Sequence, residues 1–321
     1  MDAVRFGVVG LGEGRARARR VQHTAGAVLA GICDRDAERL RTASAALGCR
    51  GFAAYEAMLA DASIEVIYVV TPSGTHLEMG AQAAAAGKHV IVIKPMETTV
   101  ARGQRLIEVC HAHGVHLVVD FEWRYTPPLQ QWKVALAAGE FGDVLFAEAR
   151  CKVWRDQAYY DQGGWRGTWE LDGGGSLANQ GIHAVDLLVW LCGTPKVLTA
   201  RSGVLAHRIE TEDLTVALLE LPNGRPAMLT TTTCYHLDNE FGVTISGTLG
   251  SASNLPLGEL SLKFARDGRA CLRTPAPDWP KSAGEDMIYV LREGTSPHVS
   301  GAEGLRSIQL MEAVYRAAGV R

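Results

Sequence analysis

The chain of 321 residues lacks several features that would each point to a particular class of protein. It has no apolar run near the roughly 20 residues that cross a bilayer, and residues 1–5 lack a signal-peptide pattern. Its seven cysteines are scattered and never spaced as C-x-x-C, which argues against a disulfide framework and a zinc site. These absences predict a cytoplasmic protein without a membrane segment.

The sequence also lacks an excess of charge of one sign. Its formal net charge of -3 gives no reason to expect a polyanionic partner. The run GRARARR at residues 14–20 is short and isolated, whereas a nucleic-acid-binding protein has a more extended basic surface. We therefore expect no nucleic-acid partner.

The length is generous for one domain, so we expect two. In the first 122 residues, apolar β-branched runs alternate with segments of helical period, which predicts an α/β domain with a parallel sheet. The expected strands lie at residues 5–10, 27–33, 66–70, 89–93 and 115–121. Residues 1–122 therefore form the first expected domain.

The first of these runs leads into GLGEGRARA, which supplies the first two glycines of the dinucleotide fingerprint G-x-G-x-x-G. Arg15 stands at the third position, with Gly14 before it, and is interpreted either as a pyrophosphate contact or as a solvated side chain. The first 122 residues are thus predicted to be a Rossmann domain. Its expected turn contacts are Gly10, Gly12, Glu13, Gly14 and Arg15.

Asp34 ends the second run, at about the 20-residue offset where a carboxylate accepts a hydrogen bond from the adenosine ribose. That carboxylate would repel a 2′-phosphate, although the adjacent Arg35 can accommodate one. We therefore predict NAD as the cofactor, with NADP as the alternative. Both Asp34 and Arg35 are expected cofactor contacts.

Polar residues also follow the later runs, where ligands bind in open α/β sheets. Lys94, followed by Pro95 at a strand end, is interpreted as functional. His76 has a second interpretation, as a loop or cap residue. The further expected cofactor contacts are Thr71, Pro72, Ser73, His76 and Lys94.

From residue 123 the pattern changes to strands joined by short turns, which predicts a mostly antiparallel sheet. The expected strands are 144–153, 197–204, 214–221, 227–234 and 241–247, with helices at 129–138 and 177–191. Residues 123–321 are therefore predicted to form an α+β domain.

The second of these helices follows three glycines, at residues 173–175. Asn179, His183 and Asp186 fall at i, i+4 and i+7, so their side chains share one face. The pattern favours neither a functional histidine nor a core histidine paired with Asp186. The histidines at 111, 113 and 116 straddle an expected helix end and strand start, and we expect no metal site.

Taken together, several segments resemble the glucose-fructose oxidoreductase and inositol dehydrogenase (Gfo/Idh/MocA) family, from Arg5 to about Ala317. The segments, besides Asp34, are GVVGLGEG, VVTPSGTHLEM (69–79), AGKHVIVIKP (86–95), FEWRYTPP, WRGTWELDGGGSLANQGIHAVDLL (165–188) and TISGTLGS (244–251). The resemblance implies a Rossmann domain followed by a domain whose open sheet forms a homodimer or homotetramer.

The resemblance also implies hydride transfer between NAD(P) and a secondary alcohol of a sugar, cyclitol or sugar derivative. By resemblance, His183 is the general acid/base and Lys94 polarises the reacting oxygen. Asn179 occupies a position that is often aspartate, and Ile93 one that is usually glutamate. We interpret Asn179 as a residue that hydrogen-bonds the substrate.

Aromatic rings and planar donors suit a polyhydroxylated ring. The expected substrate contacts are Lys94, Arg124, Tyr160, Trp165, Arg166, Asn179 and His183, with inter-domain packing as an alternative for Trp165. Two other functions stay open: an NAD-using glycosidase or epimerase with transient oxidation, and a cofactor-binding regulator without turnover.

Overall fold

The computed structural model describes residues 3–255, 260–265 and 268–320, which fall into two compact units. Unit 1 comprises residues 1–97, 101–122 and 280–304, and unit 2 comprises 98–100, 123–279 and 305–321. Within the described residues, no helix combines the length and the apolar character needed to span a membrane.

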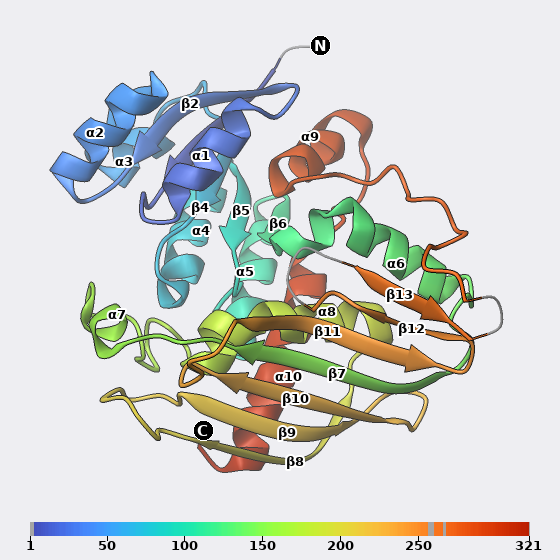
Figure 1. The fold of residues 1–321 in the computed structure, drawn as a ribbon. Coiled ribbons are helices and arrows are strands. Elements are labelled where there is room, and N and C mark those ends of the chain that lie inside the picture. The colour runs from blue at the N-terminus through green and yellow to red at the C-terminus, as the bar shows by residue number, and fades with distance from the viewer. Residues whose placement is uncertain (1–2, 256–259, 266–267, 321) are drawn as a thin grey trace. The chain divides into compact units, whose positions relative to one another are not determined.

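Unit 1 is built on a six-stranded, fully parallel sheet in the order β3-β2-β1-β4-β5-β6 (Figure 1). The order reverses at β1 and β4, which defines the doubly wound dinucleotide-binding topology that the alternating runs predicted. The strands are β1 (Val4–Val9), β2 (Ala27–Cys33), β3 (Arg50–Phe52), β4 (Val66–Val69), β5 (His89–Ile93) and β6 (Leu117–Asp120).

The helices of unit 1 follow the strands in sequence, and local residues explain where they begin and end. For α2, the Asp36 carboxylate accepts from Arg39 N at 2.9 Å, and Gly48 takes a positive φ of 61° after the last turn. The helices are α1 (Gly14–Gln22), α2 (Ala37–Leu47), α3 (Tyr55–Leu59), η1 (Ser73–Thr75), α4 (His76–Ala85) and α5 (Val100–Ala112).

A segment from the end of the chain completes unit 1. Helix α9 (Ala283–Glu293) buries Met287 and Val290, and Val119 of β6 donates its N–H to Val299 O at 2.9 Å. The expectation that residues 123–321 form one uninterrupted domain therefore needs correction at residues 280–304. Sequence periodicity describes local elements and does not report which sheet a late helix joins.

Unit 2 contains a seven-stranded sheet in the order β13-β12-β11-β7-β10-β9-β8. Among the strand pairs of the described residues, β10 and β7 alone are parallel, so the expected mostly antiparallel sheet is confirmed. The strands are β7 (Val144–Lys152), β8 (Lys196–Gly203), β9 (Leu214–Glu220), β10 (Pro226–Thr232), β11 (Glu240–Gly247), β12 (Gly250–Ser253) and β13 (Ser261–Phe264). The last two were not predicted.

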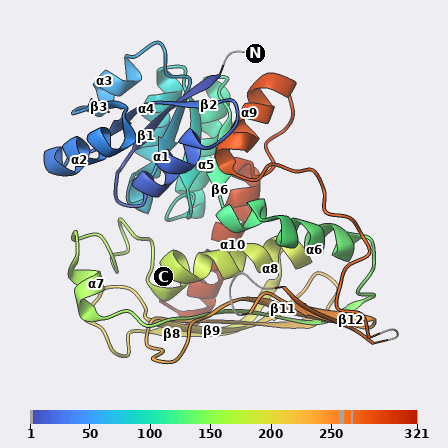
Figure 2. The ribbon, with the colours of Figure 1, turned by 45° about the horizontal axis from the view of Figure 1, so that its top comes forward.

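Helix α8 (Ile182–Cys192) lies against one face of this sheet, where it contacts β7 and β11 (Figure 2). It is apolar on all sides, with ten of its residues buried, as expected of a core helix. The preceding segment η3 (Ser176–Gly181) is wound as a π-helix, so the predicted single helix has two parts. The other helices are α6 (Pro127–Ala137), η2 (Glu122–Tyr125), α7 (Gln157–Asp161) and α10 (Gly301–Ala318).

Candidate functional site

The glycine turn after β1 gives each of its three glycines a different role. Gly10 has a φ of 88°, and a Cβ there would lie 2.4 Å from Val70 O. A Cβ on Gly12 would meet nothing within 4 Å, which leaves the main chain open to a ligand. Gly14 is buried at the start of α1, where a Cβ would lie 3.4 Å from Val8 and Val70. Gly14, and not residue 15, therefore provides the close helix-to-strand approach.

The basic run after this turn is divided between the core and the surface. Arg17 is buried and its Nε donates to Asp120 Oδ2 at 2.7 Å, while its Nη2 lies 3.0 Å from Glu122 Oε2. Tyr68 also donates to Asp120. Arg15 is half-buried and Arg19 is exposed. Arg17 thus links α1 to the end of β6, a role that the sequence did not reveal.

Asp34 lies at the end of β2 and is 6% exposed. Its Oδ2 accepts from Leu11 N at 2.7 Å and its Oδ1 accepts from Asp36 N at 2.8 Å. Arg39 Nη1 lies 3.4 Å from both oxygens. The carboxylate is therefore fixed beside the glycine turn and carries a nearby counter-ion, whereas the adjacent Arg35 is exposed.

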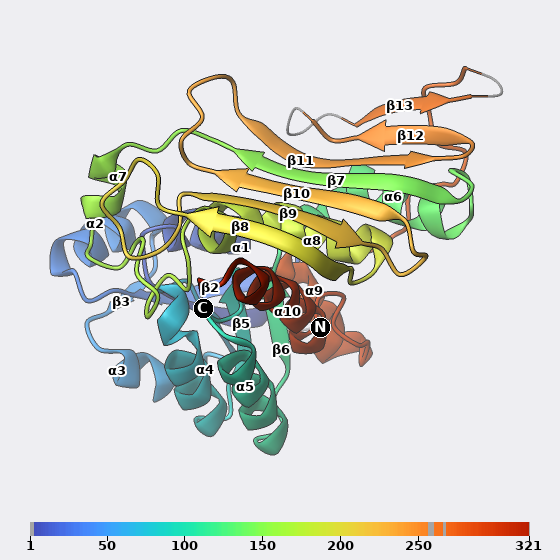
Figure 3. The ribbon, with the colours of Figure 1, turned by 90° about the horizontal axis from the view of Figure 1, so that it is seen from below.

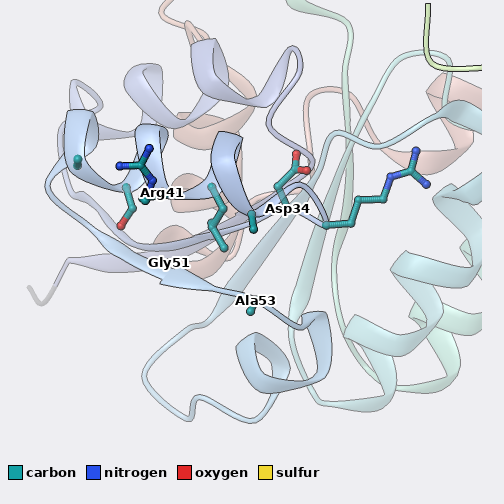
Figure 4. A pocket seen from close by; sticks show the side chains of 9 residues that line it. Asp34, Arg41, Gly51 and Ala53 are labelled. Atoms are coloured by element: carbon teal, nitrogen blue, oxygen red, sulfur yellow. The ribbon is translucent and has the colours of Figure 1, made fainter.

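A hollow of about 540 Å³ opens beside this carboxylate, between α2 and β3. Asp34 lies at one end of it, and Arg41 lies toward the other (Figure 4). Its lining residues are Asp34, Arg35, Ala37, Leu40, Arg41, Ser44, Ala45, Gly51 and Ala53. The two predicted ribose-side residues thus border a cavity within unit 1.

His76, an expected cofactor contact, is enclosed between two loops of unit 1. Its side chain is fully buried, its Nδ1 lies 3.1 Å from Pro95 O, and its Nε2 lies 2.9 Å from Thr71 O. Burial lowers the pKa of this imidazole. Because its two ring nitrogens lie within hydrogen-bonding distance of main-chain carbonyls in two loops, His76 packs between the loop after β4 and the loop after β5. Lys94 lies half-buried at that second loop, after a cis Lys94–Pro95 bond.

In unit 2, the glycine run before η3 is held by a buried glutamate. Glu212 accepts from Gly175 N at 2.9 Å, from Leu177 N at 2.7 Å and from Tyr315 OH at 3.1 Å. Burial raises the pKa of its carboxyl, against the opposing effect of these donors. A Cβ on Gly175 would lie 1.8 Å from Glu212 O, so only glycine allows this approach.

A second carboxylate orients the expected substrate residue Asn179. Asn179 Nδ2 donates to Asp172 Oδ1 at 2.6 Å, and Asn179 Oδ1 accepts from Gln180 Nε2 at 2.9 Å. Asp172 is 1% exposed and also accepts from Gly167 N at 2.9 Å. Sequence reasoning missed Asp172 and Gln180, although Asp172 directly precedes the glycine run and Gln180 directly follows Asn179.

His183 is 7% exposed, and its ring stacks on Trp123 with centroids 5.1 Å apart and planes inclined by 17°. One turn later, Asp186 binds Arg124 through both carboxylate oxygens, at 2.8 Å to Nε and 2.7 Å to Nη2. Ser307 donates to the same carboxylate at 2.8 Å. Asp186 is therefore the counter-ion of Arg124, and its orienting role for His183 stays a prediction.

The other expected substrate residues are held in different ways. Tyr160 is 5% exposed and its hydroxyl lies 2.8 Å from Thr233 Oγ1, so this hydroxyl is engaged inside unit 2. Trp165 and Arg166 are half-buried and contact one another, with Arg166 Cζ 4.6 Å from the Trp165 ring centroid. These two side chains remain available for a ligand of unit 2.

The described residues also gather three potential metal ligands that are distant in sequence: His207, Asp213 and Cys234. His207 Nδ1 lies 3.0 Å from Asp213 Oδ2, and His207 Nε2 lies 2.8 Å from Arg155 O. Asp213 additionally accepts from the N–H groups of residues 205–207. Through these bonds, the His207–Asp213 pair anchors the main chain at Arg155.

Two family models match the chain. Residues 4–121 match the oxidoreductase family with an NAD-binding Rossmann fold. Residues 129–253 match the GFO/IDH/MocA C-terminal domain. The two matches fall on the two halves that the sequence distinguished, and they agree with the parallel and the mixed sheet described above.

Similar solved structures include the WlbA dehydrogenases of Bordetella pertussis and Chromobacterium violaceum, both in complex with NADH and UDP-GlcNAcA. The first is 34% identical with a TM-score of 0.86, over 99% of this chain and 96% of that one. The second is 30% identical with a TM-score of 0.85, over 99% and 94%. The NADP-dependent D-xylose 1-dehydrogenase of Haloarcula marismortui is 26% identical over 79% of this chain and 72% of its own length.

Proposed function

The chain belongs to the GFO/IDH/MocA oxidoreductase family, and from this premise we propose that it oxidises or reduces a secondary alcohol of a sugar, cyclitol or sugar derivative. Membership makes it an NAD(P)-dependent oxidoreductase acting on CH–OH groups. The proposal rests on two features of the chain. The dinucleotide turn of unit 1 leaves open space at Gly12, and in unit 2 His183 of helix α8 stacks on Trp123.

The residues of unit 1 fit a dinucleotide. The open space at Gly12 and the N-terminus of α1 suit a pyrophosphate, and the fixed Asp34 carboxylate suits a ribose diol. When bound, NAD(P) accepts or donates the hydride at the nicotinamide C4. Because Asp34 would face a 2′-phosphate with like charge, we propose a preference for NAD.

We assign proton transfer to His183. In the oxidising direction an imidazole nitrogen takes the proton of the substrate hydroxyl, and in the reducing direction it returns that proton. Stacking on Trp123 fixes the ring plane, so little reorganisation is needed at the moment of transfer. Lys94 is proposed to stabilise the negative charge that develops on the same oxygen, and Asn179 to hydrogen-bond the substrate.

The names of the relatives support a sugar-type substrate. WlbA binds a nucleotide-linked sugar acid together with NADH, and the haloarchaeal relative acts on D-xylose. Both ligands present secondary hydroxyls on a ring.

We further propose that the open sheet of unit 2 pairs two or four copies of the chain. Five large apolar side chains on its strands are between 37% and 48% exposed: Leu145, Leu198, Val216, Leu218 and Met228. Val216 and Leu218 alternate with buried residues along β9, so they share one face of the sheet. Leu218→Glu should shift the molar mass measured by light scattering toward the monomer.

The function is tested by following reduced-nicotinamide absorbance with NAD and NADP against free sugars, inositols, sugar phosphates and nucleotide sugars. His183→Ala should lower kcat by roughly 100- to 10,000-fold and leave the affinity for NAD unchanged, because the proposed loss is one of proton transfer. His236→Ala, at an exposed histidine of the same unit, is the matched control and should keep full activity.

Loss of NAD binding in His183→Ala would contradict the assignment of this helix. Tight NAD binding by the wild type without net reduction across the panel would instead favour a redox-cycling glycosidase or epimerase, or a regulator without turnover.

A further inference from the structure

Two arginines of unit 2 face one tyrosine ring. The Cζ of Arg155 lies 5.2 Å from the Tyr159 ring centroid, and that of Arg166 lies 4.7 Å from it. Tyr159 belongs to α7, which lies at one end of the seven-stranded sheet (Figure 3). Two positive charges are thus gathered on one aromatic side chain.

Neither guanidinium has an internal counter-ion. Over residues 3–255, 260–265 and 268–320, Arg155 and Arg166 form no salt bridge, and the Nε of Arg166 is buried without a hydrogen-bond partner. The nearest acids in sequence have other partners: Asp156 accepts from Tyr159 N at 2.8 Å and Asp161 from Gln157 at 2.9 Å. A buried donor without a partner calls for an explanation, and an anion bound at this guanidinium would supply one.

Both arginines extend from fixed main chain. Arg155 O accepts from His207 Nε2 at 2.8 Å, and Arg155 N donates to Thr233 O at 3.0 Å. Directly after Arg166, Gly167 donates its N–H to Asp172 at 2.9 Å and accepts from Glu210 N at 3.0 Å. The main chain at both arginines is therefore already ordered in the folded protein, and ligand binding does not have to order it.

The pair adjoins the residues proposed to contact the substrate. Arg155 Nη2 donates to Gln180 Oε1 at 2.8 Å, and Gln180 Nε2 donates to Asn179 Oδ1 at 2.9 Å. Gln180 also donates to the Tyr159 hydroxyl at 2.9 Å. An anion on the arginines would therefore belong to a molecule that also reaches Asn179.

We propose that Arg155 and Arg166 form a subsite for an anionic group of the substrate, so that the substrate is an acidic sugar derivative. The shared chemistry is a planar or tetrahedral oxyanion, a carboxylate or a phosphate, which the guanidinium fork binds through two parallel hydrogen bonds. This inference rests on the proposed function, since it specifies the substrate of the same site.

The test uses matched ligands that differ by one anionic group. UDP-GlcNAcA is compared with UDP-GlcNAc for the carboxylate, and glucose 6-phosphate with glucose for the phosphate. Equilibrium binding to the NAD-loaded protein is measured by calorimetry, and turnover is followed separately by reduced-nicotinamide absorbance. Binding reports on the subsite even where no hydride is transferred, so failure of the subsite and failure of the proposed function are distinguishable.

In at least one pair, the ligand with the additional anionic group should bind wild type more than tenfold more tightly than its partner without that group. Arg166→Gln should remove roughly 10- to 100-fold of that affinity, raise KM and keep kcat within about twofold. Arg208→Gln, at a neighbouring exposed arginine, is the control and should match wild type. Equal binding of both members of each pair, no binding of either UDP-GlcNAcA or glucose 6-phosphate, or an equal loss in Arg166→Gln for ligands with and without the additional anionic group would overturn the proposal.

Discussion

The side-chain nitrogen of Asn179 lies 2.6 Å from a carboxylate oxygen of Asp172. The position that is often aspartate in the resembling family is thus neutral here, and a buried carboxylate stands next to it in unit 2. Two carboxylates at this separation could not both ionise, because like charges raise the pKa of one of them strongly. In this chain, Asp172 therefore supplies the carboxylate beside residue 179.

This arrangement predicts that simple reversion at residue 179 is harmful. Asn179→Asp should lower kcat/KM and the free energy of unfolding, whereas adding Asp172→Asn should recover both. A double-mutant cycle on urea unfolding should give a coupling of about 1–3 kcal/mol. Additive effects of the two substitutions would show that the pair does not act as a unit.

Substitutions at two glycines of the turn after β1 should affect different properties: the stability at Gly10 and NAD binding at Gly12. Gly10→Ala should cost about 1–3 kcal/mol of unfolding free energy, because alanine would be held at a φ of 88° and against Val70 O. Gly12→Ala should leave stability within about 0.5 kcal/mol and weaken NAD binding, since its Cβ projects into open space. Thermal or urea unfolding measures the stability of each variant, and titration with NAD measures its cofactor affinity. A Gly10→Ala variant as stable as wild type would contradict the first expectation.

Asp34 predicts the cofactor preference. Asp34→Asn should raise the NADP-to-NAD affinity ratio roughly tenfold, because a like-charge contact with a 2′-phosphate costs several kcal/mol. Asp36→Asn is the matched control, since its carboxylate caps α2 without facing the glycine turn. Titration of both variants with each cofactor measures the ratio, and an equal shift in the two variants would indicate a general electrostatic effect.

Asp213 predicts a pH dependence of stability. Burial alone would raise the pKa of its carboxyl, but hydrogen bonds from Ala206, Leu205 and His207 outweigh burial and lower it. A lowered folded-state pKa gives stability that is complete above the unfolded value of about 3.9 and is lost as pH falls through the folded value. The free energy of unfolding measured with urea should therefore differ between wild type and Asp213→Asn, and this difference should narrow below about pH 4. A difference that stays constant with pH would contradict the prediction.

The sequence by itself determined the elements with strong local patterns. Alternating apolar runs and a glycine fingerprint located the parallel sheet, its first turn and Asp34, because strand and turn preferences depend on neighbours in the chain. The family resemblance added the identity of the second half, including the helix that carries His183. The short strands β3, β12 and β13 were missed because their sequences RGF, GSAS and SLKF lack the apolar β-branched runs that marked the other strands.

Only the tertiary structure decided which distant side chains meet. The ring nitrogens of His76 lie close to main-chain carbonyls of two separate loops, and Asp186 binds Arg124, which lies 62 residues away in sequence. The Arg155–Tyr159–Arg166 group likewise depends on a loop held by His207 and Asp172. A buried polar group needs a hydrogen-bonding partner, and the fold determines which distant residue lies close enough to be that partner. Spacing along the chain does not encode this choice.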